Sequence, residues 1–123
     1  MTGTQQYWPT EIRLNAAKDR LHVAFDDGTE FALSAEFLRV HSPSVEVRGH
    51  GAEDRKVLGG KSKVMIAAIE PVGNYAVRLV FSDGHSTGIF SWAYLHEVGS
   101  GESALWRLYL HDLERLGLQR DPA

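Results

Sequence analysis

The chain has 123 residues, of which 43% are hydrophobic and 24% are charged, and this composition is typical of one ordinary globular domain. A formal net charge of −3 argues against a nucleic-acid partner and against binding to an anionic membrane surface. The absence of cysteine excludes disulfides, thiolate nucleophiles and sulfur ligands for zinc or an iron–sulfur cluster. The opening residues have neither a basic start nor a long apolar run, so we expect a cytoplasmic protein.

The N-terminal part of the sequence predicts three antiparallel strands. Apolar and polar residues alternate in EIRLN (residues 11–15) and RLHVAFD (residues 20–26), as they do in half-buried strands. Asp27-Gly28 then predicts a tight turn, because glycine tolerates the positive φ that short hairpin turns need. TEFAL (residues 29–33) returns from this turn as the third strand.

A serine and a proline frame the element that follows. Ser34 can cap a short helix over residues 35–40, because its hydroxyl can accept a hydrogen bond from a free amide of the first turn. This helix must end before Ser42-Pro43, since the residue ahead of a proline avoids helical ψ. The first unit of the chain is therefore strand, turn, strand, helix.

The same order of elements recurs in the second half of the chain. Its parts are a strand over residues 74–82, the turn Asp83-Gly84, a strand over 85–90, the cap Ser91 and a helix over 92–98. Gly28 aligns with Gly84, and after one inserted residue Ser34 aligns with Ser91. Two explanations of this repeat stay open. Either two similar units pack in the same way, or the units arose by an ancient duplication.

The remaining segments complete a prediction of the fold class. Residues 42–63 are rich in glycine and charge, which predicts a long loop of the kind that often carries function. A strand over 64–73 should pair with the strand after it, and apolar residues at helical spacing predict a helix over 104–118. We expect an α+β fold: a two-layer sandwich with a mostly antiparallel sheet of five or six strands, two similar strand-turn-strand-helix units and a C-terminal helix. Trp106 and Leu110 give that helix a second apolar contact, either within the domain or with a partner.

Motifs that carry chemistry are scarce. GGKSK (residues 59–63) resembles the end of a phosphate-binding loop, but Arg55 stands where that motif needs its first glycine. His41, His50 and His85 could approach one another, yet their spacing fits no metal motif. We therefore expect no catalytic residue, no cofactor and no metal.

Three runs of sequence carry a resemblance to a known family: PTEIRL (9–14), FLRVHSPSVEVRGHG (37–51) and IEPVGNYAVRLVFSDGHSTGIFSWAYL (69–95). They resemble the gamma-butyrobetaine hydroxylase-like N-terminal domains, or domain of unknown function 971, in the standalone form found in bacteria. The resemblance covers residues 9–99, implies a two-layer α+β domain and leaves residues 100–123 as a C-terminal helical extension. In the carnitine-pathway dioxygenases such a domain precedes a catalytic domain with iron and 2-oxoglutarate, and nothing in this chain resembles that catalytic half.

The resemblance also indicates which residues of this chain stand at the positions of zinc ligands. The dioxygenase version has three cysteines in the pattern Cys-x-Cys-x-x-Cys after a Leu-Arg pair, and one later histidine. Alignment on the Leu-Arg pair places Ser42, Ser44 and Val47 at the cysteine positions, and only His85 is kept. Serine is a poor zinc ligand and valine is none, so we expect no zinc. We expect His85 instead to bridge by a hydrogen bond to the turn at Ser42-Pro43-Ser44.

Two hypotheses of function follow. The first is a noncatalytic accessory or binding module with a protein partner, because similar domains are fused to dioxygenases and to a plastid P-loop ATPase of iron–sulfur cluster delivery. The partner would then belong to iron–sulfur protein assembly or be of the dioxygenase type, and the chain would be a monomer or weak homo-oligomer. The alternative is a small ligand-binding protein or enzyme that uses the loop Arg48–Gly51, with Arg48 holding an anion and His50 moving a proton.

The expected partner-binding surface consists of the glycine-rich loop, the adjoining turn and the edge around the later histidine. Arginine offers five donors in a planar fork and is enriched at interface hot spots. The residues that we assign to this surface are Ser42, Ser44, Arg48, His50 and His85.

Overall fold

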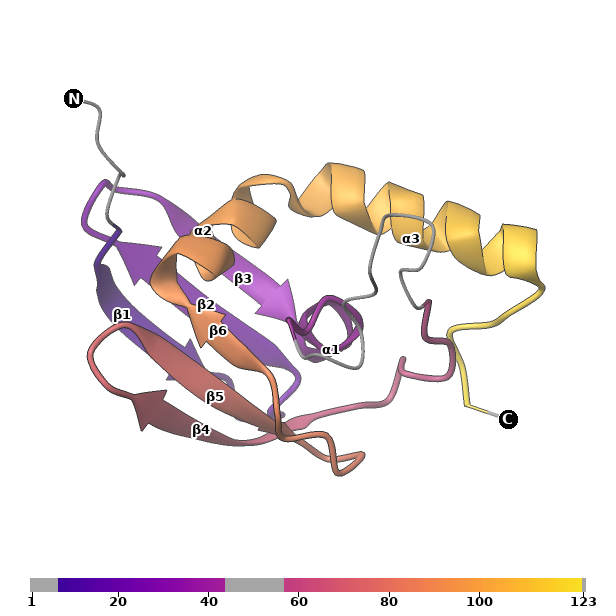
Figure 1. The fold of residues 1–123 in the computed structure, drawn as a ribbon, viewed down its shortest axis with the longest axis horizontal. Coiled ribbons are helices and arrows are strands. Elements are labelled where there is room, and N and C mark those ends of the chain that lie inside the picture. The colour runs from indigo at the N-terminus through magenta and orange to yellow at the C-terminus, as the bar shows by residue number, and fades with distance from the viewer. Residues whose placement is uncertain (1–6, 44–56, 123) are drawn as a thin grey trace.

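Residues 7–43 and 57–122 are described by the computed structural model of this chain, and they form six strands and three helices. In chain order the elements are β1 (Pro9–Leu14), β2 (Arg20–Phe25), β3 (Glu30–Ser34), α1 (Ala35–Val40), β4 (Ile66–Val72), β5 (Ala76–Phe81), β6 (Ile89–Ser91), α2 (Trp92–Ser100) and α3 (Glu102–Leu116). The α+β class and the antiparallel pairing of the strands are confirmed (Figure 1). The strands form two three-stranded sheets, β1-β2-β3 and β4-β5-β6, where the sequence suggested one sheet.

The turns of the two repeated units have the same geometry. Gly28 has a φ of 90° and Gly84 a φ of 94°, in the left-handed region that favours glycine. The Gly28 N–H donates to Phe25 O and the Gly84 N–H donates to Phe81 O, both at 3.0 Å. The turns predicted at the two Asp-Gly pairs are therefore confirmed.

The helices of the two units begin in the same way as well. The Ser34 hydroxyl accepts a hydrogen bond from Phe37 N–H at 3.0 Å, and the Ser91 hydroxyl accepts one from Tyr94 N–H at 3.1 Å. Both serines have extended backbone angles, as N-cap residues do. Both predicted caps are therefore confirmed.

Each unit is tied to the other by a basic side chain of its helix. Arg39 of α1 donates through Nε to Asp83 Oδ2 at 2.7 Å, in the turn of the second unit. His96 of α2 lies with Nε2 2.9 Å from Asp27 Oδ2, in the turn of the first unit. Arg39 aligns with His96 in the repeat and Asp27 aligns with Asp83, so the two units brace each other reciprocally.

One apolar core lies between the two sheets and the first two helices. Its largest fully buried members come from β2, β3, α1, β4, β5, β6 and α2 in turn: Leu21, Val23, Leu33, Phe37, Leu38, Ile66, Leu79, Phe81, Phe90 and Leu95. Because both units contribute to one cluster, neither sheet has a core of its own. No helix formed by residues 7–43 or 57–122 is long and apolar enough to cross a membrane.

Helix α3 lies against α1 through a second, smaller apolar cluster. Tyr109 and Leu113 of α3 pack on Val40 of α1 there. The Trp106 ring lies 6.4 Å from the Phe37 ring, centroid to centroid, so of the two contacts considered for this tryptophan the one within the domain is present. Leu110, the other residue expected to widen the apolar surface, is 38% exposed.

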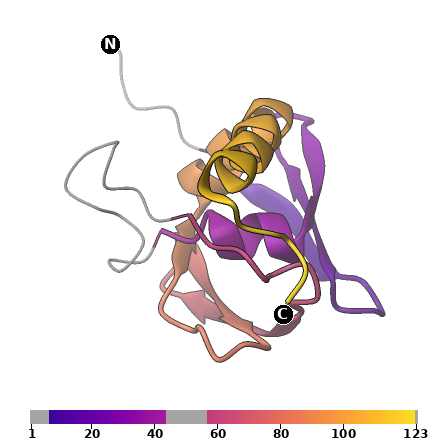
Figure 2. The same ribbon diagram turned by 90° about the vertical axis from the view of Figure 1, so that its right-hand side faces the viewer.

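After α3 the chain turns back along an earlier loop. Gly117 has a φ of 70° and ends the helix in the left-handed region. The residues that follow, 118–122, are called the tail segment here, and they run beside residues 59–62, the receiving segment (Figure 2). Arg120 of the tail segment binds both carboxylate oxygens of Glu36 in α1, at 2.8 and 3.0 Å.

We expect Arg120→Ala to lower the free energy of unfolding by about 2 kcal/mol, because it removes the paired cation from a carboxylate that is only 6% exposed. Chemical denaturation measures this loss. Arg13→Ala is the matched control: Arg13 and its partner Glu11 are 58% and 48% exposed at their side chains, so the change should cost no more than about 0.5 kcal/mol. Equal losses in the two variants would contradict a stabilising role for the Glu36–Arg120 pair.

Candidate functional site

The structure brings together two of the residues assigned to the partner-binding surface. Ser42 lies just after α1, and His85 lies just after the turn at Gly84. The Ser42 Oγ and His85 Nε2 atoms are 3.0 Å apart, in a hydrogen bond between residues from the two units. The bridge that we expected from His85 to the turn at Ser42 is therefore present. Ser44, Arg48 and His50 lie outside the described residues.

The serine of this pair is enclosed on all sides. Ser42 is only 1% exposed. Gly88 packs so closely on it that a Cβ at position 88 would lie 2.0 Å from Ser42 Oγ and 3.3 Å from Phe90 Cε1. A serine–histidine pair can activate a nucleophile, but the hydroxyl must then reach a substrate carbon. This hydroxyl has no room for one, so the pair is structural.

Asp83 holds the histidine side of the site in place. Its Oδ1 atom accepts a hydrogen bond from the His85 backbone N–H at 3.1 Å. Its Oδ2 atom accepts from Arg39 Nε at 2.7 Å and from Lys61 Nζ at 2.6 Å. Lys61 belongs to the GGKSK run, and its amine forms an ion pair with Asp83.

The surroundings of Asp83 change its acidity. Burial alone would raise its pKa, but the hydrogen bonds from Lys61, from the His85 backbone and from Arg39 outweigh burial and lower the pKa from 3.8 to about 2. Because the pKa is lower in the folded state, the carboxylate contributes stability above about pH 4, and this contribution is lost as the pH falls through about 2.

We expect the stability difference between the wild-type chain and Asp83→Asn to be constant from pH 7 to about pH 4 and to shrink as the pH falls toward about 2. Urea denaturation of both chains between pH 7 and pH 2 measures this difference. The comparison with the variant is needed because Asp27 titrates in the same pH range: hydrogen bonds from the side chain and backbone of Thr29 lower its pKa to about 2 as well. Both chains contain Asp27, so its effect cancels in the difference. A difference that does not change with pH would contradict the assignment to Asp83.

The histidines near the site are engaged in hydrogen bonds of the fold. The His41 Nδ1 atom lies 3.0 Å from Phe37 O, and the His41 carbonyl accepts a hydrogen bond from the Tyr94 hydroxyl at 2.5 Å. Among residues 7–43 and 57–122, no three histidine, aspartate or glutamate side chains are grouped so that they could hold one metal ion. The described part of the site therefore does not present a set of metal ligands.

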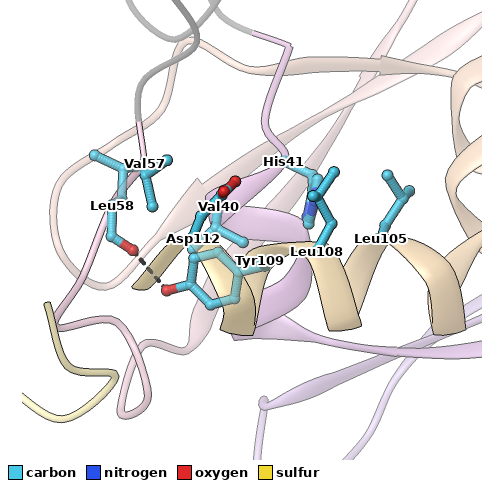
Figure 3. Close-up of a pocket in the computed structure, with 8 residues that line it drawn as sticks. All are labelled: Val40, His41, Val57, Leu58, Leu105, Leu108, Tyr109 and Asp112. Atoms are coloured by element: carbon cyan, nitrogen blue, oxygen red, sulfur yellow. Dashed lines mark hydrogen bonds between the residues drawn. The ribbon is translucent and has the colours of Figure 1, made fainter. Parts of the chain in front are cut away.

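A small pocket lies between α1, α3 and residues 57 and 58 (Figure 3). The residues that line it are Val40, His41, Val57, Leu58, Leu105, Leu108, Tyr109 and Asp112. The cavity volume is about 30 Å³, which holds one or two waters, whereas pockets for drug-sized ligands have about 300–1,000 Å³. Another concavity, with Trp106 and Arg107 on its wall, is an open surface of α3 alone.

Tyr109 forms one wall of the small pocket between α1 and α3. Its hydroxyl donates to Leu58 O at 2.5 Å. Burial and the nearby negative charge of Glu36 raise its pKa to about 12, so the hydroxyl stays protonated and keeps this hydrogen bond. Sequence reasoning missed this contact, because helical spacing marks Tyr109 as apolar and contains no signal for a loop carbonyl opposite.

Comparison with known proteins identifies the family. Residues 12–96 match the family model described as gamma-butyrobetaine hydroxylase-like, N-terminal. The chain belongs to this family. The match ends inside α2, so α3 and the tail segment lie beyond it.

Solved structures of similar chains support this assignment. Two proteins solved in solution by NMR are 41% and 44% identical, with TM-scores of 0.84 and 0.82; the alignments cover 97% and 99% of this chain and 94% and 92% of theirs. A crystal structure of a family protein of unknown function from Acidithiobacillus ferrooxidans is 38% identical, with a TM-score of 0.62 over 74% of this chain and 91% of that one. Among curated proteins, none matches the chain.

The residues present do not fit the zinc site that the resemblance to the dioxygenase domains implies. Ser42 stands at the first cysteine position, and its hydroxyl is hydrogen-bonded to the one histidine that is kept. The other two cysteine positions, Ser44 and Val47, lie outside the described residues, and neither residue type is a zinc thiolate ligand.

We therefore expect protein purified without an affinity tag to contain no stoichiometric zinc and to melt at the same temperature with and without a chelator. Elemental analysis and thermal melting measure these two properties. His85→Ala is the control, because it removes the histidine that the resemblance places at a zinc-ligand position. About one zinc per chain, lost in His85→Ala, would contradict this prediction.

Proposed function

We propose that this protein is a noncatalytic accessory module that binds a protein partner through the surface around His85. The observation that supports this most is the Ser42–His85 hydrogen bond. This bond joins His85, which the resemblance places at a zinc-ligand position, to the turn that follows α1, and Ser42 is buried there. A side-chain pair arranged in this way shapes a surface and leaves no reactive group free.

The surface next to this pair contains charged groups in fixed positions. Asp83 is 20% exposed at its side chain and is held by Arg39 and Lys61. Lys61 is 22% exposed at its side chain, so the ion pair reaches the solvent. Charges that are already ordered lose little conformational entropy when a partner binds, which favours a protein interface.

The resemblance to domains fused to other proteins suggests the class of partner. We propose a partner linked to iron–sulfur protein assembly or one of the dioxygenase type, to which this chain supplies the accessory domain as a separate polypeptide. Arg48 and His50 complete the proposed surface as its polar anchors.

Affinity capture with the wild-type chain and with Arg48→Ala and His50→Ala tests the proposal. Loss of an anchor should weaken capture, since a hot-spot residue contributes about 2 kcal/mol or more to binding. Stability should change by no more than about 0.5 kcal/mol, as is usual for surface substitutions. If both variants melt several degrees early, these residues are structural and the proposal fails; if both stay stable and capture the same partner, the surface lies elsewhere.

The alternative is a small ligand-binding protein or enzyme that uses the loop Arg48–Gly51. An NMR ligand screen of the amides of this loop distinguishes the two functions. A ligand that shifts these amides, together with no specific protein partner, would favour the alternative. Silent loop amides with specific capture would favour the accessory module.

A further inference from the structure

The receiving segment holds the tail segment by its backbone. The Gly60 N–H donates to Gln119 O at 2.8 Å, and the Ser62 N–H donates to Arg120 O at 3.0 Å. The Ser62 hydroxyl also donates to Asp121 Oδ1 at 2.6 Å. Main-chain hydrogen bonds of this kind give affinity for an extended peptide without regard to most of its side chains.

One side chain of the tail segment is recognised specifically. The Arg120 guanidinium binds Glu36 with two hydrogen bonds, through Nε at 3.0 Å and Nη2 at 2.8 Å. It also lies 5.2 Å from the centre of the Trp106 ring. A buried carboxylate and an aromatic face match the planar, delocalised cation of arginine better than the point charge of lysine.

Two glycines shape the receiving segment, one through the close approach of the tail segment and one through its backbone angle. A Cβ on Gly59 would lie 2.7 Å from Gln119 O, so any other residue there would push the tail segment away. Gly60 has a φ of 74°, which a residue with a side chain adopts only with strain. The receiving segment is therefore shaped for another backbone.

The tail segment is held by polar contacts and has little share in the core. Leu118 is 40% exposed, and the Arg120 side chain is 48% exposed. Segments with little buried apolar area open locally at a lower free energy than the core does. The tail segment can thus detach from the receiving segment while the domain stays folded.

We infer that the groove formed by Gly59–Ser62, Glu36 and Trp106 is a binding site for an arginine-bearing peptide segment, and that the tail segment occupies it in cis. A partner with such a segment would compete with the tail. The arginine would take the place of Arg120, and the backbone around it would accept the hydrogen bonds from Gly60 and Ser62. The groove shares Lys61 with the surface around His85, but the contacts that hold the tail segment come from Gly60, Ser62 and Glu36, so this inference does not depend on the proposed function.

A peptide with the sequence of residues 118–122, blocked at both ends, is the probe. It is added to the full-length Arg120→Ala chain, in which the arginine position of the groove is vacant, and the Gly60 and Ser62 amides and the Trp106 indole are followed by NMR. We expect saturable shifts of all three signals toward their wild-type positions. A peptide with alanine in place of arginine, and the Glu36→Gln/Arg120→Ala chain with the original peptide, should each bind at least about 10-fold more weakly. The wild-type chain should also bind at least about 10-fold more weakly, because its own tail competes at an effective concentration in the millimolar range.

The inference would be overturned if the Arg120→Ala chain is folded but shows no saturable shift. It would also be overturned if this chain binds the original peptide and the alanine peptide equally. Amide hydrogen exchange of the wild-type chain gives a second reading, which does not require the variant to fold. We expect the Gly60 and Ser62 amides to exchange at least about 100-fold faster than the Leu79 amide of the core, through opening of the tail segment alone. Equal protection of these amides would mean that the tail leaves only on global unfolding, and the inference would fail.

Discussion

Asp83→Asn should lower the free energy of unfolding by about 3 kcal/mol, because it removes the negative charge opposite a largely buried guanidinium. The Arg39 side chain is 11% exposed, and its Nη1 atom is buried without a hydrogen-bond partner among the described residues. Asparagine keeps an oxygen for the His85 backbone N–H, so the turn itself should survive. Denaturation in urea at neutral pH measures the loss.

Glu70→Gln is the matched control for this variant. It also changes a carboxylate paired with an arginine into an amide, but Glu70 and Arg78 are 47% and 48% exposed at their side chains. An exposed ion pair contributes at most about 1 kcal/mol, so the control should lose far less stability. Equal losses in the two variants would show that Arg39 does not depend on Asp83.

Gly88→Ala should cost about 3 kcal/mol, at the upper end of what overpacking a core does. The new Cβ would lie 2.0 Å from Ser42 Oγ, a distance at which one of the two atoms must move. In the Ser42→Ala background that oxygen is absent, so the same change at Gly88 should cost about 1–2 kcal/mol less. A double-mutant cycle of these variants measures the coupling.

Gly101→Ala serves as the control for introducing an alanine. A Cβ there would meet nothing closer than Glu97 O at 3.5 Å, and its φ of −102° suits any residue. Its effect should stay within about 0.5 kcal/mol. If Gly88→Ala cost the same with and without the Ser42 hydroxyl, the close packing that encloses the serine would be disproved.

The parts of the fold that depend on neighbouring residues were predictable from the sequence. The caps at Ser34 and Ser91 and the turns at Gly28 and Gly84 use hydrogen bonds within four residues, so local residue types determine them. The division into two sheets was not predictable, because the turns indicate which consecutive strands pair but not whether the first three strands also pair with the last three. Each set of three consecutive strands forms a sheet of its own, β1-β2-β3 and β4-β5-β6.

The candidate site was predictable only where the repeat or the resemblance pointed to it. The bridge from His85 to Ser42 was expected because the resemblance places both residues at positions of zinc ligands. The repeat contains a signal for two contacts that were not predicted, Arg39 with Asp83 and His96 with Asp27. Basic residues align in the two helices, and acidic residues align in the two turns. The contact between Glu36 and Arg120 spans 84 residues, and no local pattern marks it.

Photo-cross-linking from two positions tests the central proposal, a partner-binding surface around His85, most directly. A photoreactive residue replaces Ser86, next to His85, and in a second chain it replaces Asn74, which lies at the opposite end of β5. We expect that one polypeptide, linked to iron–sulfur assembly or of the dioxygenase type, is cross-linked from position 86 and not from position 74. The yield at low protein concentration should fall by about 30-fold in the presence of Arg48→Ala, the equivalent of about 2 kcal/mol of binding. The same products from both positions, or no specific product from position 86, would contradict the account.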